Sequence, residues 1–405
     1  MTETHSSSAA RPAASVSRWR RAAPAEVPAW LRGVYAGLCL YLFLAALNIM
    51  GAGLGTFGEE SDFLIRAFAY GENPFIALLG AVLVTAIVQS SSFTSALIVT
   101  LVATGEMTLG TAVFAIMGAN IGTSVTALIV ALANLRIRRT FRRSFTAALL
   151  HDFFNILTVL VLFPLEWLTA AVAESGRGVI TQAAAWLANL LGLPEVARPD
   201  SPVKVLTSPV VSLFEGGGAL VAPTATAQGL IVAAGGLVLM LVALVLMVRN
   251  LRGALLRHMD SLFRSYFFRT DPRAYGIGAI STLMVQSSTI TTSLMVPLAG
   301  AGVVPMRRVM PFMMGSNLGT TATSVLAATA NPVSAALTVA FVHVLFNLIG
   351  TAIWYPLRVI PVRLASWYGR LAGRSLLYAF GFLLLIFLVL PVTGLIVTEL
   401  FIIHG

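Results

Sequence analysis

Charged residues are scarce in this chain: only 10% of its 405 residues are Asp, Glu, Lys or Arg, whereas 58% are hydrophobic. A soluble domain carries about 25% charged residues, so too few are present here to cover a water-soluble surface. The mean hydropathy is +0.89, and the stretches 34–53, 229–248 and 376–400 are each long enough to cross a hydrocarbon core of about 30 Å as a helix. The composition excludes a soluble protein and predicts an all-α polytopic membrane protein.

Cysteine is nearly absent as well. The single cysteine, Cys39, lies inside the first apolar stretch, which excludes an intramolecular disulfide and argues against redox chemistry. No HExxH-type motif or nucleophile–base pair occurs within the apolar segments. We therefore expect neither an enzyme nor an organic cofactor.

Basic residues are unevenly placed. The formal net charge is +10, and 22 of the 26 Lys and Arg residues fall into five clusters. The clusters span 11–32, 136–143, 249–273, 307–308 and 358–374. Acidic residues such as Glu59, Glu60 and Asp62 lie in other segments. Cytoplasmic loops of membrane proteins carry such an excess of Lys and Arg, so the charge indicates orientation in a plasma (inner) membrane and not a nucleic-acid partner.

The first 33 residues are rich in Ala, Ser, Pro and Arg, a composition typical of disorder. We predict a disordered basic cytoplasmic tail over 1–33 and an uncleaved first helix over 34–53. A secretory signal is the alternative for a basic stretch before an apolar run. The run over 34–53 is longer than an ordinary signal core, which favours the helix and a cytoplasmic N-terminus.

Two distant segments resemble each other. Residues 89–128 and 286–325 are identical at 14 of 40 positions with a constant offset of 197. The identities include Gln, Ser, Asn and Thr positions, where apolar membrane sequences do not match by chance. HDFFN at 151–155 also matches HVLFN at 343–347, with an offset of 192. The pattern predicts two repeats that arose by gene duplication.

Each repeat contains an apolar run that is too long for one helix. The runs cover 73–106 and 276–306 and carry a Gln-Ser-Ser motif near the middle. At about 1.5 Å per residue, one straight helix would overshoot the bilayer. We therefore predict two short helices per run, folded as a re-entrant hairpin. With two such hairpins, all 22 clustered basic residues lie in the cytoplasm and the repeats have inverted topology.

The predicted organisation follows the repeats. After the tail, it comprises a first transmembrane repeat over 34–172, an extracytoplasmic connection over 173–225, a second transmembrane repeat over 226–357, and a cytoplasmic linker with a final transmembrane helix over 358–405. A surface helix is expected near 179–191 within the connection.

Polar residues at the two hairpin tips are candidate substrate ligands, because inverted-repeat transporters bind substrate where their broken helices meet. The N-termini of half-helices offer unpaired N–H groups and a positive dipole end, and hydroxyls donate to anion oxygens. Hydrogen bonding between helices is the alternative for one such motif, but two motifs in register favour a site. The expected anion ligands are Gln89, Ser90, Ser91, Ser92, Gln286, Ser287, Ser288 and Thr289.

Oxygen ligands for a cation are expected nearby. The segments GANIGTSVT (118–126) and GSNLGTTAT (315–323) combine Gly, Asn and Thr in apolar surroundings. Glycines permit unwinding, which frees carbonyl oxygens to join those of Asn and Thr; close packing through small residues is the alternative. The candidate sodium ligands are Asn120, Thr123, Asp152, Asn155, Gln286, Ser287, Asn317, Thr320, Thr323 and Asn347.

Asp152 is the only acidic residue that this topology places in the membrane interior, away from the segment ends. An intramembrane carboxylate costs about 2.5 kcal/mol or more and is usually functional. This favours a cation or proton role over a position near the interface. His151 precedes Asn155 by about one helical turn, as His343 precedes Asn347, and both an ion-related role and polar contacts between helices fit these pairs.

Fixed positive charge is missing from the expected site. Residues 74–105, 109–133 and 276–306 contain no Lys, Arg or His. A helix dipole supplies only about half a charge, too little for a multiply charged anion. Cations bound beside the anion must balance it, which makes the two binding events mutually dependent. The sequence thus predicts coupled cotransport.

At these residues the sequence resembles the type II sodium-dependent phosphate cotransporter family, in particular bacterial members without a C-terminal regulatory domain. The resemblance covers residues 34–172 and 226–390. Its motifs are the two QSS[ST] motifs, GANIGTS, FRR-x-F, HDFFN-x-L and VLVLFPLE. The family pattern implies electrogenic, sodium-driven uptake of divalent phosphate.

The resemblance also implies roles for individual residues. Phosphate would lie between the two QSS[ST] tips, with one sodium near Gln286, Ser287, Thr320 and Thr323. Asp152 matches the aspartate of electrogenic members, where electroneutral members have glycine. The chain departs from the pattern at Arg136-Ile137, where vertebrate members carry Gly-Asp, and so lacks a carboxylate linked to another sodium site.

We expect a secondary active transporter that couples sodium influx to inorganic phosphate uptake by alternating access, with phosphate, sodium and the lipid bilayer as partners. A sodium-coupled carrier of organic anions is the alternative, because glutamate transporters also use opposed Ser-rich hairpins. Those carriers have Asp, Asn and Arg in the last helix, and 376–400 has none of these. An anion channel is a further alternative, which saturable, sodium-dependent uptake would exclude.

Overall fold

The computed structural model describes residues 29–60, 73–132, 134–190, 202–262, 268–330 and 333–404. Across these residues the regular structure is helical and contains no strand, which confirms the predicted all-α class. The predicted tail lies outside the described residues up to residue 28. The first helix already begins at Ala29, so residues 29–33 are helical and the expected tail boundary is too late.

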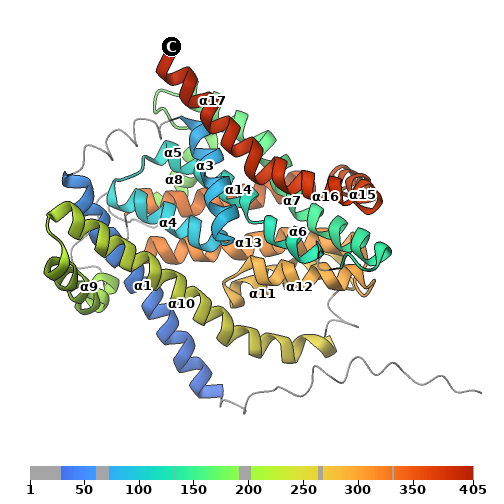
Figure 1. Cartoon of the computed structure of the whole chain (residues 1–405), viewed down its shortest axis with the longest axis horizontal. Helices are drawn as coiled ribbons and strands as arrows, with labels where there is room; N and C mark the ends of the chain where they lie inside the picture. Colours follow the sequence, from blue (N-terminus) through green and yellow to red (C-terminus); the bar gives the residue numbers. More distant parts are fainter. Residues whose placement is uncertain are drawn as a thin grey trace, which may run out of the picture.

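The helices fall into two halves along the chain (Figure 1). The first half contains α1 (Ala29–Glu60), α3 (Pro74–Val88), α4 (Ser91–Thr104), α5 (Leu109–Gly122), α6 (Val125–Leu132), α7 (Arg138–Val172), α8 (Val179–Leu190) and α9 (Pro202–Val221). The second contains α10 (Ala225–Leu262), α11 (Asp271–Val285), α12 (Ser288–Gly300), α13 (Met306–Ala330), α14 (Ser334–Trp354), α15 (Val359–Arg374), α16 (Leu376–Leu384) and α17 (Leu390–His404), and the π-helical segment Leu385–Val389 joins the last two.

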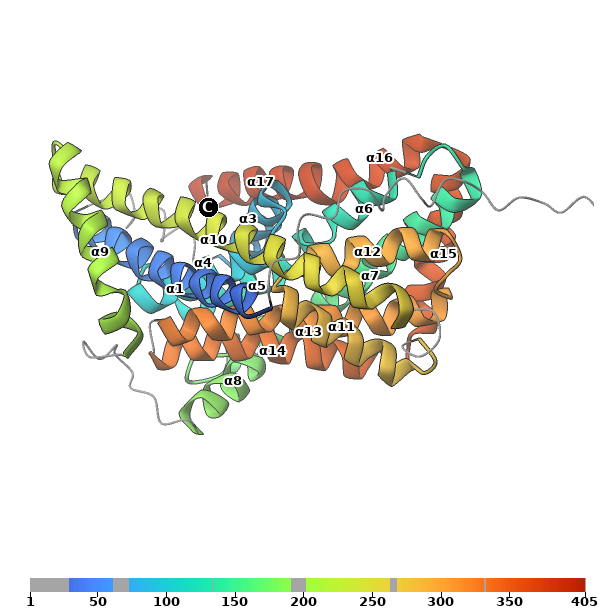
Figure 2. The same ribbon diagram turned by 90° about the horizontal axis from the view of Figure 1, so that it is seen from below.

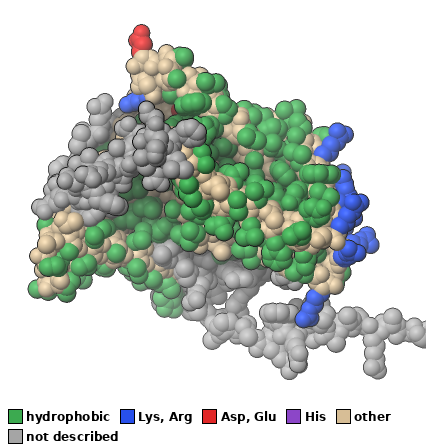
Figure 3. Space-filling model, turned by 45° about the horizontal axis from the view of Figure 1, so that its top comes forward, with side chains coloured by type: hydrophobic (Ala, Val, Ile, Leu, Met, Phe, Trp, Pro, Cys, Tyr) green, Lys and Arg blue, Asp and Glu red, His purple; other side chains and the backbone are tan. Residues whose placement is uncertain are grey.

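Four helical stretches in the described part of the chain are long and apolar enough to cross a membrane. They are Leu109–Leu132, Arg138–Val172, Ser334–Trp354 and Leu376–Thr398. Figure 3 shows a largely hydrophobic face on which Lys and Arg gather along one edge. Such a surface, apolar in its middle and basic at one end, is that of a multi-pass membrane protein.

Helices also occupy segments that the sequence suggested were loops or connections. α7 begins at Arg138 and so includes part of the basic cluster 136–143, which the sequence suggests is a loop. The connection over 173–225 contains α8 and α9, and α8 is a helix where one was expected near 179–191. The linker before the last helix contains α15.

The two long apolar runs are each divided into two short helices, as predicted. α3 and α4 occupy the first run, and α11 and α12 occupy the second. With 15 residues, α3 spans about 22 Å, which is shorter than the hydrocarbon core. Asn73 caps the start of α3 by accepting from the N–H groups of Phe75 and Ile76, and Pro74 fills the first helical position.

The glycines of the two matching segments pack helices closely. A Cβ on Gly118 would collide with the carbonyl oxygen of Leu78 on α3, and one on Gly315 with that of Tyr275 on α11. The expected unwinding occurs in the first segment, where α5 ends at Gly122 and α6 begins two residues after Thr123. It is absent from the second, because α13 runs unbroken from Met306 to Ala330. The close-packing interpretation therefore holds for these glycines.

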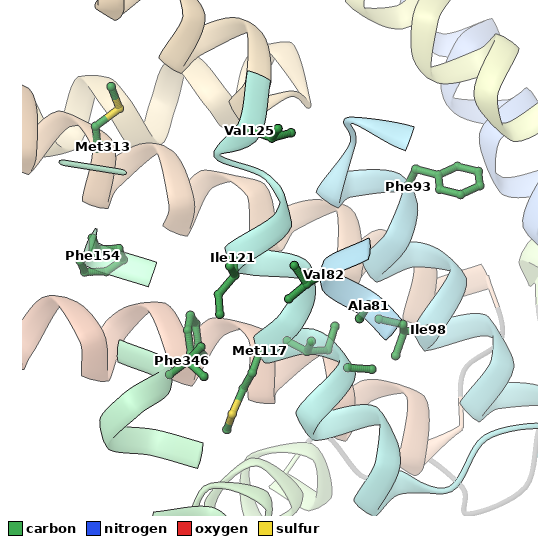
Figure 4. Close-up of a cluster of buried hydrophobic side chains, with 14 of the residues drawn as sticks. Ala81, Val82, Phe93, Ile98, Met117, Ile121, Val125, Phe154, Met313 and Phe346 are labelled. Carbon is green, nitrogen blue, oxygen red and sulfur yellow. The ribbon is translucent and has the colours of Figure 1, made fainter. Parts of the chain in front are cut away.

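The packing brings the two halves together. α13 contacts α4 and α7 as well as its own neighbour α11, and α14 contacts α4 and α5. Figure 2 shows α11, α13 and α14 beside one another under the region of α4 and α5. In Figure 4, Met117 and Ile121 project from α5 toward Phe346 of α14. α4 packs against α13 and α14, and α12 packs against α6 and α7, so each break adjoins helices of the other half. Gln89 at the first break is exposed, and Gln286 at the second is half-buried.

Candidate anion and cation site

Two glutamines form the turns that divide the apolar runs. Gln89 has a φ of 56° and Gln286 a φ of 54°, both left-handed, and they are the only non-glycine residues with positive φ in the described structure. Holding a non-glycine residue in this conformation costs about 1–3 kcal/mol and is characteristic of ligand-binding and switch regions. The same strained turn at both places makes the two positions a candidate site.

The serine after each glutamine starts the next helix. Ser90 caps α4 by accepting from the N–H of Phe93, and Ser287 caps α12 by accepting from the N–H of Ile290. Ser91 and Ser288 follow in the first helical turn with exposed fractions of 4% and 2%. Since first-turn N–H groups have no partner within their own helix, each tip presents donors and a positive dipole end beside a buried serine.

The two tips contact each other through reciprocal hydrogen bonds. The hydroxyl of Ser92 donates to the backbone carbonyl of Gln286 at 3.2 Å. The hydroxyl of Thr289 donates to the backbone carbonyl of Gln89 at 3.3 Å. The structure thus brings the four predicted anion ligands at 89–92 next to the four at 286–289, which lie about 200 positions further along the chain.

Two threonines fix the glutamine side chains. Thr323 on α13 donates to Gln286 Oε1 at 3.0 Å, and Thr126 on α6 donates to Gln89 Oε1 at 3.4 Å. Thr323 also lies 3.4 Å from the hydroxyl of Ser92. Sequence reasoning named Thr323 but missed Thr126, although these two threonines are an identical pair at the offset of 197. The repeat was the signal that could have identified Thr126.

Asp152 on α7 is a fully buried carboxylate, with an exposed fraction of 0%. Neither of its carboxylate oxygens has a hydrogen-bond partner among the described residues. Ser124, in the break between α5 and α6, is the neighbouring hydroxyl. A buried, unpaired carboxylate is strongly unfavourable unless a cation balances it or a proton neutralises it, so this group fits the cation or proton role expected from the sequence.

A buried hydrogen-bond relay links the two halves next to Asp152. His151 Nε2 donates to Asn317 Oδ1 at 2.6 Å, and Asn317 Nδ2 donates to Asn155 Oδ1 at 2.7 Å. Asn155 Nδ2 in turn donates to the backbone carbonyl of Asn120 at 2.8 Å. Three candidate ligands, Asn120, Asn155 and Asn317, therefore meet in one cluster. Their side chains lie on three different helices, α5, α7 and α13.

The matching residues of the second half are less completely bonded. Asn347 Nδ2 donates to the carbonyl of His343 on its own helix, and His343 Nδ1 lies 2.7 Å from the hydroxyl of Ser324. Asn347 Oδ1 and His343 Nε2 are buried and have no partner in the described structure. The side chain of Asn120 meanwhile bonds the carbonyl of Ile116 on its own helix. Asn347 is thus not joined to the relay.

The remaining candidates bond within their own helices. Thr123 donates to the carbonyl of Ala119 and Thr320 to that of Ser316. Such bonds leave hydroxyl lone pairs free to coordinate a cation. No hydrogen bond described here joins either threonine to the tips.

Comparison with known proteins gives a consistent result. The model of the Na+/Pi-cotransporter family matches residues 42–180 and 239–386. The chain is 32% identical over 415 residues to sodium-dependent phosphate transport protein 2A of Mus musculus, which covers 87% of this chain and 65% of the relative. It is 30% identical over 437 residues to sodium-dependent phosphate transport protein 2B of Homo sapiens, covering 87% and 63%. The chain thus spans slightly under two thirds of the length of these relatives. No solved structure matches it.

Proposed function

Since the chain belongs to the Na+/Pi-cotransporter family, we propose that it is a secondary transporter that couples sodium influx to the uptake of inorganic phosphate. The relatives named above are sodium-dependent phosphate transporters by name. In this chain, the main support for the proposal is the pair of tips. Gln89 and Gln286 adopt the same strained conformation, and the carbonyl of each accepts a hydrogen bond from a hydroxyl of the opposite tip.

Phosphate binds between the tips in this proposal. The first turns of α4 and α12 converge there and supply backbone N–H donors, and the hydroxyls of Ser91 and Ser288 add further donors. Ser92 and Thr289 now bond to the opposite glutamine carbonyls. We infer that they turn toward phosphate when it enters, which parts the two tips.

Sodium supplies the charge that the tips lack. The helices that form the tips carry no Lys, Arg or His between residues 276 and 300 or between 74 and 104. Asp152 offers one full negative charge to a cation, and Gln286 with Thr323 offers uncharged oxygens to another. Because divalent phosphate and Asp152 together carry three negative charges, we propose that sodium ions enter in excess and that uptake is electrogenic.

Alternating access is the proposed mode of transport, with the two repeats inserted in opposite directions. In that arrangement the two tips are re-entrant hairpins, the N-terminus lies in the cytoplasm and the membrane is the inner membrane. The unequal bonding of the two His–Asn pairs supports two alternating states. In the state opposite to this one, we expect Asn120 to bond with His343 and Asn347 as Asn317 here bonds with His151 and Asn155.

Uptake into proteoliposomes tests the proposal. Purified protein is reconstituted, and labelled phosphate is added outside with either sodium or choline as the external cation. We expect accumulation only with an inward sodium gradient. Equal accumulation in choline would contradict the proposed coupling, and uptake that never saturates with phosphate would indicate a channel.

A further inference from the structure

Five arginines line one cavity at the edge of the molecule. The cavity has a volume of about 590 Å³ and is lined by Arg138, Arg139, Arg142, Arg370, Gly373 and Arg374. The first three arginines come from the start of α7 and the last two from the end of α15, and Figure 2 shows α15 at one end of the elongated molecule. Two elements that are far apart in sequence thus converge to build a strongly basic cavity.

The walls of this cavity are held in place by specific contacts. Arg138 donates to the backbone carbonyls of Gly373 and Arg374 at 3.1 Å and so caps the end of α15. The stem of Arg142 packs against Gly373, where an added Cβ would lie 3.3 Å from it. Further along α15, Gly369 packs directly on Thr146 of α7. The arginines are therefore presented by a fixed frame.

No carboxylate balances the five guanidinium groups in the described part of the chain. By contrast, Arg308 on α13 and Arg358 just before α15 both form ion pairs with Asp271 of α11. The five arginines of the cavity form no ion pair among the described residues. Five like charges in one cavity repel each other, and a phosphate group, which arginine binds in bidentate fashion, would relieve that repulsion.

The surroundings favour a lipid as the source of the phosphate. α15 buries one face, formed by Pro361, Ala365, Gly369 and Ala372, and exposes Trp367 on another. Beyond the cavity, α16 exposes Leu377, Tyr378 and Phe380. An amphipathic helix with Arg and Trp on its outer side is typical of the membrane interface, and basic pockets at cytoplasmic helix ends bind lipid headgroups.

We propose that the cavity between α7 and α15 binds the phosphate-bearing headgroup of an anionic phospholipid, whose acyl chains lie against the apolar face of α16. The ligand is a structural lipid, distinct from the transported phosphate, and its site lies at the edge of the protein. The bound lipid holds the start of α7, the helix that carries Asp152, at the membrane interface.

Native mass spectrometry of the purified full-length chain tests this assignment. The test variant is the triple replacement Arg139→Gln, Arg142→Gln and Arg370→Gln, which spares the capping residue Arg138. The control variant removes the same charge from exposed arginines outside the cavity. It combines Arg136→Gln, Arg307→Gln and Arg363→Gln. Each protein is incubated with phosphatidylglycerol, phosphatidylcholine or inorganic pyrophosphate.

We expect the native chain and the control variant to retain phosphatidylglycerol in preference to phosphatidylcholine, and the test variant to bind it about 100-fold more weakly. Equal loss in both variants would overturn the proposal, because it would mean that the lipid responds only to overall charge. Retention by the test variant would overturn it as well. Binding of pyrophosphate as strong as that of the lipid would assign the cavity to a soluble anion instead. Size-exclusion profiles of both variants check that the chain remains folded.

Discussion

The two halves of the molecule build the same tip but not the same polar cluster behind it. At the tips, Gln89 and Gln286 share one conformation, and the hydroxyl contacts are reciprocal. Behind the tips, each histidine keeps one unpaired buried nitrogen, but both amide atoms of Asn155 are bonded across helices, whereas Asn347 Oδ1 has no partner among the described residues. The matched tips suit one substrate held between them, and the unmatched clusters indicate that this state favours one half.

One difference between the two polar clusters is a difference in sequence, so it is the same in every conformational state of the protein. The aspartate of HDFFN, Asp152, corresponds to Val344 of HVLFN. Of these two matching positions, only the one in the first half therefore has a carboxylate that can balance the charge of a cation. In the proposed mechanism, the two halves therefore share the substrate site, and only the first half contributes a carboxylate to charge coupling.

Substitutions at the tips should reduce phosphate uptake the most, and the reduction should be equal for the two halves. Ser90→Val or Ser287→Val removes a helix cap and a donor and adds bulk where phosphate enters. We expect each to reduce labelled phosphate uptake by about 100-fold, because a hydrogen bond to a charged group contributes about 1.5–3 kcal/mol. Ser90→Thr and Ser287→Thr, which keep the oxygen, serve as controls. A large loss from only one of the two valine variants would contradict the equivalence of the tips.

Removing the single carboxylate should change the charge that is moved with phosphate. In Asp152→Gly, one cation site loses its charge, so phosphate-evoked current on a solid-supported membrane should disappear while labelled uptake continues at a reduced rate. Val344→Gly is the matched change in the other half and should leave the current per phosphate unchanged. Current that persists in Asp152→Gly would assign the charge coupling to another group.

Replacing the matching asparagines Asn317 and Asn120 one at a time should show how much each polar cluster stabilises this state. Asn317→Ala leaves His151 Nε2 and Asn155 Oδ1 without partners, and an unsatisfied buried polar group costs about 1–3 kcal/mol. Asn120→Ala removes only a bond to its own helix in this state. We expect the Tm in detergent to fall clearly more in Asn317→Ala. Equal Tm values would mean that the relay does not stabilise this state.

The smallest effect is expected where single hydroxyls hold the glutamine side chains. Thr323→Val and Thr126→Val each remove one hydrogen bond, worth about 1 kcal/mol, and should raise the KM for phosphate by about 5-fold. The effect should be larger for Thr323, whose bond is shorter and which also contacts Ser92. Serine at either position restores the donor and should restore the KM. A larger change from Thr126 would contradict this ranking.

The sequence predicted the break between two short helices at each tip, because neighbouring residues in the chain determine it. A polar motif inside an overlong apolar run indicates a break, and the offset of 197 indicates that the two breaks are related. The continuity of α13 was not predictable in this way, because Gly315 packs against α11 instead of unwinding the helix. The contact between His151 and Asn317 depends on how α13 packs against α7. No spacing within either segment encodes that contact.

Phosphate binding by the purified protein in nanodiscs tests the central claim most directly, since binding separates the charge balance at the tips from transport. The account predicts that labelled phosphate binds in sodium but not in choline, and that phosphate tightens sodium binding by the same factor. Phosphate that binds with equal affinity in choline would contradict it, because the tips would then hold the anion without a cation beside it.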